Sequence, residues 1–462
     1  MIWQIAARNL FRNARRSLMT IFAIGISGTA ILLFGGFVTS IWFGVQTSLV
    51  QDQGHLQIFK RGYLAYGSAD PDSYTIDNVE DVIAAATADA DIARKIATIT
   101  PQIAFGGIAG NPADDNSKTF IGRAVRPDDV NRMRSWDSWN VGVVTDAVPL
   151  RQDDDRLAVL GVGMARMIGL CSELQLACED PPVKMVEGEV DPDMLAFIQS
   201  GPAAAMQASS GSSEATFPRL DLLAATSGGA PNIVSVDVAT ALPQAVRAVD
   251  DSLVLLHYDL ARQLLYRGDD RATSVMVQAH DPMAVDALKA DLQGVLNERG
   301  LDLEVLAFNE VDPTFNRIYG MFSVIFGVIA IVLGIVIVFT ITNTVTMNVM
   351  ERINEVGTIR ALGFRRFTVF RQFLTESLLL GLLGAGLAVV GGLAAAASIN
   401  AIGLSWTPPS NATPIAIDLM VAQNPSLIIG TALGLTLITV LASILPATRA
   451  IRFPIVTALH HA

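Results

Sequence analysis

The sequence is poor in the residues that build catalytic and metal sites. Among its 462 residues only two are cysteines and five are histidines, and the histidines are scattered along the chain. The phosphate-binding pattern Gly-x-x-x-x-Gly-Lys-Ser/Thr does not occur, and a chain without that loop cannot hydrolyse ATP by the route that uses it. We therefore expect no catalytic residues, no metal ion and no cofactor in this chain.

Two patterns that bind ligands in other proteins are incomplete here. Gly161-x-Gly163 follows an apolar run, but Gly169 does not stand at the spacing of a dinucleotide-binding turn. The acidic run 153–155 lacks the spacing of an EF-hand calcium loop. We expect a helix over residues 158–169 in the first case and a solvated acidic turn in the second.

Charge is almost absent from four long segments. They are residues 17–43, 321–346, 373–404 and 427–447. Each reaches the length of about 20 mostly apolar residues that a bilayer-spanning helix needs. We therefore predict an α-helical membrane protein with four transmembrane helices. Residues 405–426 then form a short external loop.

Arginine marks one side of the predicted membrane. Residues 1–16, an expected amphipathic helix, carry four arginines, residues 347–372 carry five, and the tail 448–462 carries two. Basic residues accumulate on the cytoplasmic side. With four spans these three places fall on the same side, so both termini are predicted to be cytoplasmic. The first span is expected to be a retained anchor, because its apolar core is too long for a cleaved signal.

Residues 44–320 are then predicted to form a large external domain. They contain 21 Lys and Arg against 40 Asp and Glu, and this acidic balance argues against nucleic-acid binding. Alternating strand and helix patterns, with strands expected at residues 274–279 and 303–307 among others, indicate an α+β fold. Cys171 and Cys178 both lie here and are predicted to form a disulfide in an oxidising compartment, with two free thiols as the alternative. Gly-, Ser- and Ala-rich composition indicates a variable insertion near residues 171–230.

Charge returns between the second and third spans, in residues 347–372. Met350, Ile353, Val356 and Ile359 recur every three residues there, which predicts a helix. A short charged helix at the inner membrane surface suits docking into a groove on a soluble partner.

Residues 351–363 also carry a resemblance. They read Glu-Arg-Ile-Asn-Glu-Val-Gly-Thr-Ile-Arg-Ala-Leu-Gly, which resembles the signature of FtsX/MacB-type ABC transporter permeases, and most closely that of the lipoprotein-releasing (LolC/LolE-like) permeases. The resemblance implies a MacB-like periplasmic domain and a coupling helix that receives the motion of a partner ATPase. The coupling residues that it implies are Glu351, Arg352, Glu355, Val356, Gly357, Thr358, Arg360, Ala361, Leu362 and Gly363.

The resemblance further implies a permease subunit of the bacterial inner membrane. An ABC ATPase subunit dimer would hold ATP and Mg, and a second permease copy or paralogue would complete the complex. The implied substrate is a lipoprotein or lipid-like molecule, moved from the inner membrane toward the outer membrane and passed to a periplasmic lipoprotein carrier. The alternatives are MacB-like efflux of peptides or drugs and FtsX-like signalling to periplasmic hydrolases.

Acyl chains of such a substrate could lie between the first two spans. The candidate residues are Phe34, Phe37, Trp42, Phe326 and Val328. For each of them an ordinary lipid-facing position is the more frequent explanation, because transmembrane helices are apolar throughout.

Two further features of the spans leave their roles open. Gly384, Ala388, Gly392 and Ala396 place small residues four apart on the third span, which fits either packing within one subunit or a dimer face. Glu376 lies at the inner membrane boundary, one turn from Arg371. We expect it to pair with basic residues rather than to carry a proton.

Overall fold

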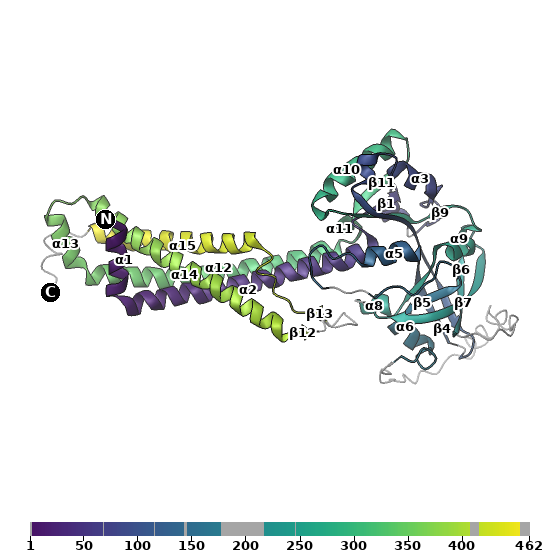
Figure 1. The fold of residues 1–462 in the computed structure, drawn as a ribbon, viewed down its shortest axis with the longest axis horizontal. Coiled ribbons are helices and arrows are strands. Elements are labelled where there is room, and N and C mark those ends of the chain that lie inside the picture. The colour runs from purple at the N-terminus through teal and green to yellow at the C-terminus, as the bar shows by residue number, and fades with distance from the viewer. Residues whose placement is uncertain are drawn as a thin grey trace. The chain divides into compact units, whose positions relative to one another are not determined.

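The computed structural model divides into two compact units (Figure 1). The first, the helical unit, comprises Met1–Gly44, Thr314–Trp406 and Ala416–Ala462, and the second, the sheet unit, comprises Val45–Pro313 and Thr407–Ile415. The structure describes residues 2–67, 69–114, 116–142, 146–176, 217–244, 246–406 and 415–452.

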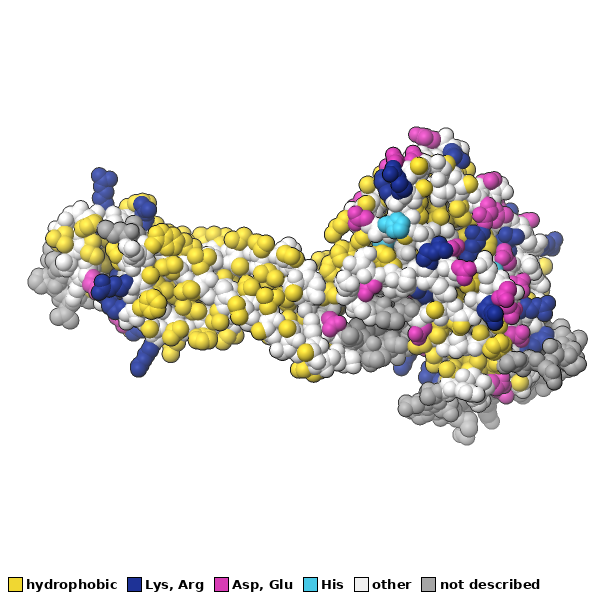
Figure 2. Space-filling view, in the orientation of Figure 1, with side chains coloured by type: hydrophobic (Ala, Val, Ile, Leu, Met, Phe, Trp, Pro, Cys, Tyr) yellow, Lys and Arg dark blue, Asp and Glu magenta, His cyan; other side chains and the backbone are white. Residues whose placement is uncertain are grey.

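The helical unit is built from six helices of the described chain. They are α1 (Ile2–Arg12), α2 (Ala14–Gln53, up to Gly44 in this unit), α12 (Thr314–Glu351), α13 (Ile353–Ala361), α14 (Arg366–Ile402) and α15 (Pro425–Arg452). By length and composition α2, α12, α14 and α15 can each cross a membrane, as the sequence predicts. Each helix continues beyond its predicted span, so the membrane boundaries stay predictions. Figure 2 shows a mostly hydrophobic surface on this unit, with Lys and Arg side chains at one end.

Small residues bring α14 against α2. A Cβ atom at Gly384 would lie 2.7 Å from Cβ of Ile24, and one at Gly392 would lie 2.9 Å from Cδ1 of Leu32. Ala388 lies opposite Gly28, where an added Cβ would come within 2.5 Å of the alanine Cβ. The small-residue stripe of the third span therefore serves packing within the chain, which was one of its two predicted roles.

Within its described residues the sheet unit combines eleven strands with short helices. The strands are β1 (Leu56–Lys60), β2 (Ile76–Asp77), β3 (Ile96–Asn111), β4 (Asn116–Val125), β5 (Leu157–Gly161), β6 (Arg219–Ala225), β7 (Pro231–Leu242), β8 (Leu253–His257), β9 (Arg271–Ala272), β10 (Ser274–Ala279) and β11 (Leu303–Ala307). The helices are η1 (Tyr63–Gly67), α3 (Val79–Ala86), α4 (Ala90–Ala93), α5 (Pro127–Arg134), α6 (Val162–Ile168), α8 (Arg247–Asp250), α9 (Tyr258–Tyr266), η3 (Pro282–Ala284), α10 (Val285–Glu298) and α11 (Phe308–Val311). Elsewhere, β12 (Ser405–Trp406) pairs with β13 (Ile415–Ala416).

The main sheet closes on itself. Its strand order is β11-β1-β10-β3-β4-β8-β5-β7-β6, and an additional β3–β6 pairing joins the last strand to the long β3. Gly107 of β3 permits this closure, because a Cβ atom there would lie 2.4 Å from the carbonyl oxygen of Leu223. Ladders β4–β8 and β5–β7 are parallel, whereas β3–β4, β6–β7 and β3–β6 are antiparallel.

Apolar side chains from these strands form a large buried cluster. It includes Ile103, Phe120, Leu160, Leu222 and Val254, together with side chains from α3, α6, α9 and α10. The mixed sheet with its covering helices confirms the predicted α+β class. At the end of the sheet order, the Gln293 side chain of α10 donates to the Leu303 carbonyl (3.1 Å) and accepts from Val305 N–H (2.9 Å). These bonds cover backbone groups of β11 that an edge strand would otherwise expose.

Several predicted details of this unit need correction. The helical pattern expected from residue 158 begins only at Val162, because residues 157–161 form β5. The predicted insertion near 171–230 is too long, since Leu220 and Leu222 of β6 are fully buried in the cluster. Residues 177–216 lie outside the described residues. Cys178 is among them, so its predicted disulfide with Cys171 stays a prediction.

Candidate functional site

The predicted connector forms a compact turn–helix–turn. The helix α12 ends at Glu351, α13 occupies Ile353–Ala361, and α14 begins at Arg366. Gly363 has φ +91°, a left-handed conformation that glycine adopts without steric cost. The connector helix is therefore shorter than the predicted segment 347–372, because α12 and α14 extend into both of its ends.

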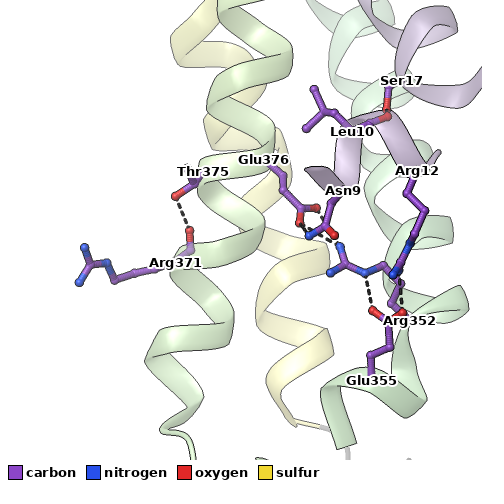
Figure 3. A network of polar contacts seen from close by, with 9 residues as sticks. All are labelled: Asn9, Leu10, Arg12, Ser17, Arg352, Glu355, Arg371, Thr375 and Glu376. Carbon is purple, nitrogen blue, oxygen red and sulfur yellow. Dashed lines mark hydrogen bonds and ion pairs between the residues drawn. The ribbon is translucent and has the colours of Figure 1, made fainter. Parts of the chain in front are cut away.

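Five polar side chains lock the connector to its neighbours (Figure 3). We call Asn9, Arg12, Arg352, Glu355 and Glu376 the polar clasp. Arg352 Nη1 donates to Glu376 Oε1 (2.9 Å) and Oε2 (3.2 Å), and Arg352 Nε donates to Glu355 Oε2 (3.0 Å). From α1, Asn9 Nδ2 donates to Glu376 Oε1 and Arg12 Nη2 donates to Glu355 Oε1, both over 2.6 Å. The clasp thus joins α1, α13 and α14.

Its centre is withdrawn from water and charged. The side chains of Arg352 and Glu376 are only 9% and 11% exposed. Burial by itself lowers the pKa of Arg352, but the carboxylates of Glu376 and Glu355 raise it, and the net direction is upward. For Glu355, burial raises the pKa, but hydrogen bonds from Arg352 and Arg12 outweigh this and hold it below its ordinary value. The side chains of Arg352 and Glu355 are therefore ionised near neutral pH.

A small cavity adjoins the clasp. Its volume is about 20 Å³, and Asn13, Asn348 and Ser377 line it together with Asn9, Arg352 and Glu376. The Asn348 Oδ1 atom is buried and has no hydrogen-bond partner among the described residues. One water molecule fits such a polar cavity. The space is too small for an organic ligand, so the clasp is a structural connection.

A second ion pair lies beside the clasp. Arg16 Nη1 of α2 lies 2.5 Å from Glu351 Oε1 at the end of α12. Arg12 and Arg16 thereby bind Glu355 and Glu351, the acidic residues on either side of Arg352 in the sequence.

Glu376 does pair with a basic residue, as expected, but its partner is Arg352. Arg371 instead lies 5.9 Å from the Phe367 ring centroid, and Figure 3 shows its side chain directed away from Glu376.

The implied coupling residues divide into two groups. Glu351, Arg352 and Glu355 bond within the chain, and Val356 and Gly357 are buried. Thr358, Ala361, Leu362 and Gly363 are exposed, whereas Arg360 is half-buried. Glu351 and Glu355 are exposed as well, so both parts of the segment present surface to a partner, and the assignment of coupling residues stays a prediction.

Sequence reasoning missed the exposed residues that follow Gly363. Phe364 and Phe367 are 50% and 64% exposed, and Leu362, a predicted coupling residue just before Gly363, is 74% exposed. Arg365 and Arg366 beside them are also exposed. We call these five residues the connector tip. The sequence signal that could have revealed this surface is the pair Phe364 and Phe367 in an otherwise charged stretch.

Four of the five candidate substrate residues lie in aromatic contacts between α2 and α12. The rings of Phe34 and Phe326 stack at a centroid distance of 6.1 Å, and Phe34 also lies 6.1 Å from Phe37. Trp42 contacts Tyr319 at 4.2 Å. Val328 is exposed on α12 and stands outside these contacts. The first four residues hold two spans together, and a role in substrate binding stays a prediction for all five.

Sequence comparison identifies relatives of part of the chain. Residues 318–455 match the family "FtsX-like permease C-terminal". The macrolide export ATP-binding/permease protein MacB of Rhodopseudomonas palustris (strain BisB18) is 27% identical over 142 residues, which cover 30% of this chain and 22% of that protein. The pyoverdine export ATP-binding/permease protein PvdT of Pseudomonas syringae pv. syringae (strain B728a) is 34% identical over 82 residues, covering 17% and 12%.

An uncharacterized ABC transporter permease of Methanocaldococcus jannaschii is 24% identical over 163 residues, which cover 35% of this chain and 41% of that protein. The chain thus spans less than half the length of these relatives. Among solved structures, the periplasmic region of MacB from Actinobacillus actinomycetemcomitans aligns with 58% of this chain and 95% of its own, at 13% identity and a TM-score of 0.31.

The extracellular domain of the noncanonic ABC-type transporter YknZ from Gram-positive bacteria aligns with 54% of this chain and 98% of its own, at 11% identity and a TM-score of 0.30. The matched family segment contains nearly all of α12 and the whole of α13, α14 and α15. The connector and most of the polar clasp therefore lie within it. Residues 318–455 of the chain therefore form an FtsX-like permease C-terminal domain.

Proposed function

We propose that this chain is the membrane subunit of an ABC transporter, driven through α13 by a separate ATPase subunit dimer that holds ATP and Mg. One observation carries the proposal. The base of the connector is fixed to α1 and α14 by the polar clasp, while the connector tip at its other end is exposed.

The connector tip supplies the contact surface in this proposal. Leu362, Phe364 and Phe367 are large apolar side chains exposed beside two arginines. Clustered exposed apolar residues mark protein contacts, and aromatic residues and arginine are enriched at the centres of interfaces. The tip lies on the predicted cytoplasmic side, where an ATPase would dock.

The polar clasp supplies the transmission. Arg352 stands between α12 and α13 and bonds the carboxylate of Glu376 on α14. A displacement of α13 therefore acts on α12 through the chain itself and on α14 through the ion pair. Asn9 binds the same carboxylate, so α1 is drawn into the movement. Coupling between distant sites needs rigid, contiguous connections of this kind.

For the substrate we propose a lipoprotein or lipid-like amphiphile, carried from the inner membrane toward the outer membrane. The aromatic contacts at Phe34 and Phe326 support this, because an acyl chain entering between α2 and α12 would replace one apolar contact by another. Export of a small molecule is the second candidate. The names of two relatives, which specify macrolide and pyoverdine export, favour it.

Co-purification of the tagged chain from its own cells, with identification of any ATPase that it retains, tests the coupling proposal. We expect a stable complex, and we expect the double variant Leu362→Ala, Phe364→Ala to weaken it at least tenfold, because interface hot spots contribute about 2 kcal/mol or more. The control is Leu404→Ala, an exposed leucine just beyond the other end of α14. The proposal fails if no ATPase is retained, or if the tip variant binds it as well as the control does.

Mass spectrometry of the nucleotide-free complex separates the two substrate classes. Retained acylated species support the amphiphile. Their absence from an active preparation rules it out, and a retained small polar molecule favours export of that compound instead. The ATPase contact does not depend on this outcome.

A further inference from the structure

The four arginines near the N-terminus fall into two pairs with different surroundings. Arg12 and Arg16 form ion pairs with Glu355 and Glu351. Arg8 and Arg15 are exposed and take part in none of the ion pairs found within the described residues. The second pair therefore has no internal role that accounts for its charge.

Apolar side chains surround this second pair. Arg15 precedes Leu18 and Met19 by one helical turn, so all three lie on the same face of α2. Leu18 and Met19 are exposed, and the exposed face continues through Phe22 and Ile26. In a helix that crosses a membrane, this face meets lipid. Arg15 therefore stands at the inner end of a lipid-facing stripe.

Helix α1 extends the same arrangement along the membrane surface. Figure 1 shows α1 running across the end of the helical bundle, beside α13. Phe11 is 82% exposed and Trp3 is 55% exposed on it, and Arg8 lies between them in sequence. A helix with exposed aromatic and basic residues lies in the membrane interface, at the depth of the headgroups. Figure 2 shows Lys and Arg side chains bordering the hydrophobic surface at this end.

We propose that Arg8 and Arg15 bind the phosphate-bearing headgroups of anionic phospholipids in the inner leaflet. Guanidinium groups bind phosphate through paired hydrogen bonds. The acyl chains of the same lipid lie along Met19, Phe22 and Ile26. A soluble polyanion or a protein would use the charge but not the lipid-facing stripe, and this favours a lipid over either of them.

Such a lipid occupies a defined place relative to the polar clasp. The side of α1 that turns inward carries Asn9, which donates to Glu376, and Arg12 bonds Glu355 of α13. A lipid bound at Arg8 and Arg15 therefore holds α1 from outside while the clasp holds it from inside. Binding itself requires no ATPase, so the inference stands apart from the proposed coupling.

Lipid binding to the full chain in neutral detergent tests the proposal. Native mass spectrometry counts bound dioleoylphosphatidylglycerol during a titration, with dioleoylphosphatidylcholine as the neutral comparison. For Arg8→Gln, Arg15→Gln we expect the apparent Kd for phosphatidylglycerol to rise about thirtyfold, from the usual contribution of two arginines near an anionic surface. Arg449→Gln, Arg452→Gln removes the same formal charge from the last turn of α15, outside the polar clasp, and we expect it to leave the preference in place.

Each other outcome overturns the assignment. Equal weakening in both double variants means that net charge alone attracts the lipid. A wild-type chain that binds the two lipids equally well has no anionic headgroup site. Glycerol 1-phosphate tests whether the site takes a free phosphate. If it raises the melting temperature of the chain as much as phosphatidylglycerol does, the site is not a lipid site. The variant Arg8→Gln, Arg15→Gln removes no described internal contact, so its melting temperature without lipid should match that of the wild type.

Discussion

Arg352 Nη1 donates to Glu376 Oε1 over 2.9 Å, although 24 residues separate them in sequence. The same carboxylate oxygen accepts from Asn9 of α1 over 2.6 Å. Three helices therefore meet at one buried carboxylate. Burying this ion pair costs desolvation energy that its Coulombic attraction offsets only with good geometry. Its physical value lies in fixing α13 relative to α14, whichever partner docks at the connector tip.

Removing the arginine should be far more damaging than removing the acid. In Arg352→Gln, Glu376 stays buried with Asn9 as its remaining described donor, and breaking a buried pair in this way costs about 3–5 kcal/mol. In Glu376→Gln, Arg352 keeps its bond to Glu355, so we expect a smaller loss. Thermal unfolding of the full chain in detergent measures both. The control Arg371→Gln should be close to neutral, and equal losses in Arg352→Gln and Arg371→Gln would contradict the clasp.

Two glycines on α14 offer a matched test of the α2–α14 contact. Gly384→Ala places a methyl group 2.7 Å from Cβ of Ile24, a fully buried residue, and overpacking of this kind costs about 1–3 kcal/mol. Gly386→Ala meets nothing within 4 Å and should be neutral or stabilise the helix by up to about 1 kcal/mol. Melting temperatures in detergent should separate the two variants. If both behave alike, the stripe does not pack within the chain.

The spans and the connector were predictable because their signals are local. Long uncharged runs define α12 and α15, and Ser274–Ala279 and Leu303–Ala307 end where the alternating patterns end. Strands β5 and β8 were not predictable in the same way. Both are buried along their whole length, so they read as continuous apolar runs that merge with the helices following them.

The partner of Glu376 shows why the site was only partly predictable. Arg371 stands five residues before it, and five residues turn a helix by about 140°, so the two side chains leave α14 on different faces. Arg352 reaches the carboxylate only because the connector folds back. That return depends on the turn at Gly363 and on packing between helices. Closure of the sheet through β3 and β6 depends on long-range pairing in the same way.

His55 should make the sheet unit sensitive to mild acid. Its Nδ1 atom accepts from Ala279 N–H over 3.1 Å, its ring contacts Trp136 edge-on, and burial lowers its pKa from 6.5 to about 4. Above pH 6.5 the folded and unfolded states are both neutral at this residue. Between pH 6.5 and 4 only the unfolded state takes up the proton, so stability falls as pH falls, by about 3 kcal/mol in total.

Melting of the full chain at pH 7.5 and pH 5 measures this loss. His55→Asn retains a side-chain acceptor for Ala279 N–H but cannot titrate, so its melting temperature should fall less on acidification. His280→Asn changes an exposed histidine, so its melting temperature should fall on acidification as much as that of the wild type. An unchanged pH dependence in His55→Asn would assign the acid sensitivity to other groups.

Asp250 explains the glycine pair at residues 161 and 163 without any bound nucleotide. Its Oδ1 accepts from Val162 N–H (3.1 Å) and Gln244 N–H (2.8 Å), and its Oδ2 accepts from Gly163 N–H (2.7 Å). A Cβ atom at Gly161 would lie 2.1 Å from the carbonyl oxygen of Asp250, so only glycine allows this approach.

Asp250→Ala should therefore be strongly destabilising, because it leaves three backbone donors without their acceptor, and a buried donor left in this state costs about 1–3 kcal/mol. The adjacent Asp251 gives the control. Its carboxylate lies 3.4 Å from Arg166 and is 25% exposed, so Asp251→Ala should cost under about 1 kcal/mol. Thermal unfolding of both variants decides the matter. Similar losses of stability in the two variants would show that negative charge in this turn stabilises the sheet unit, and that the bonds of Asp250 to the start of α6 do not.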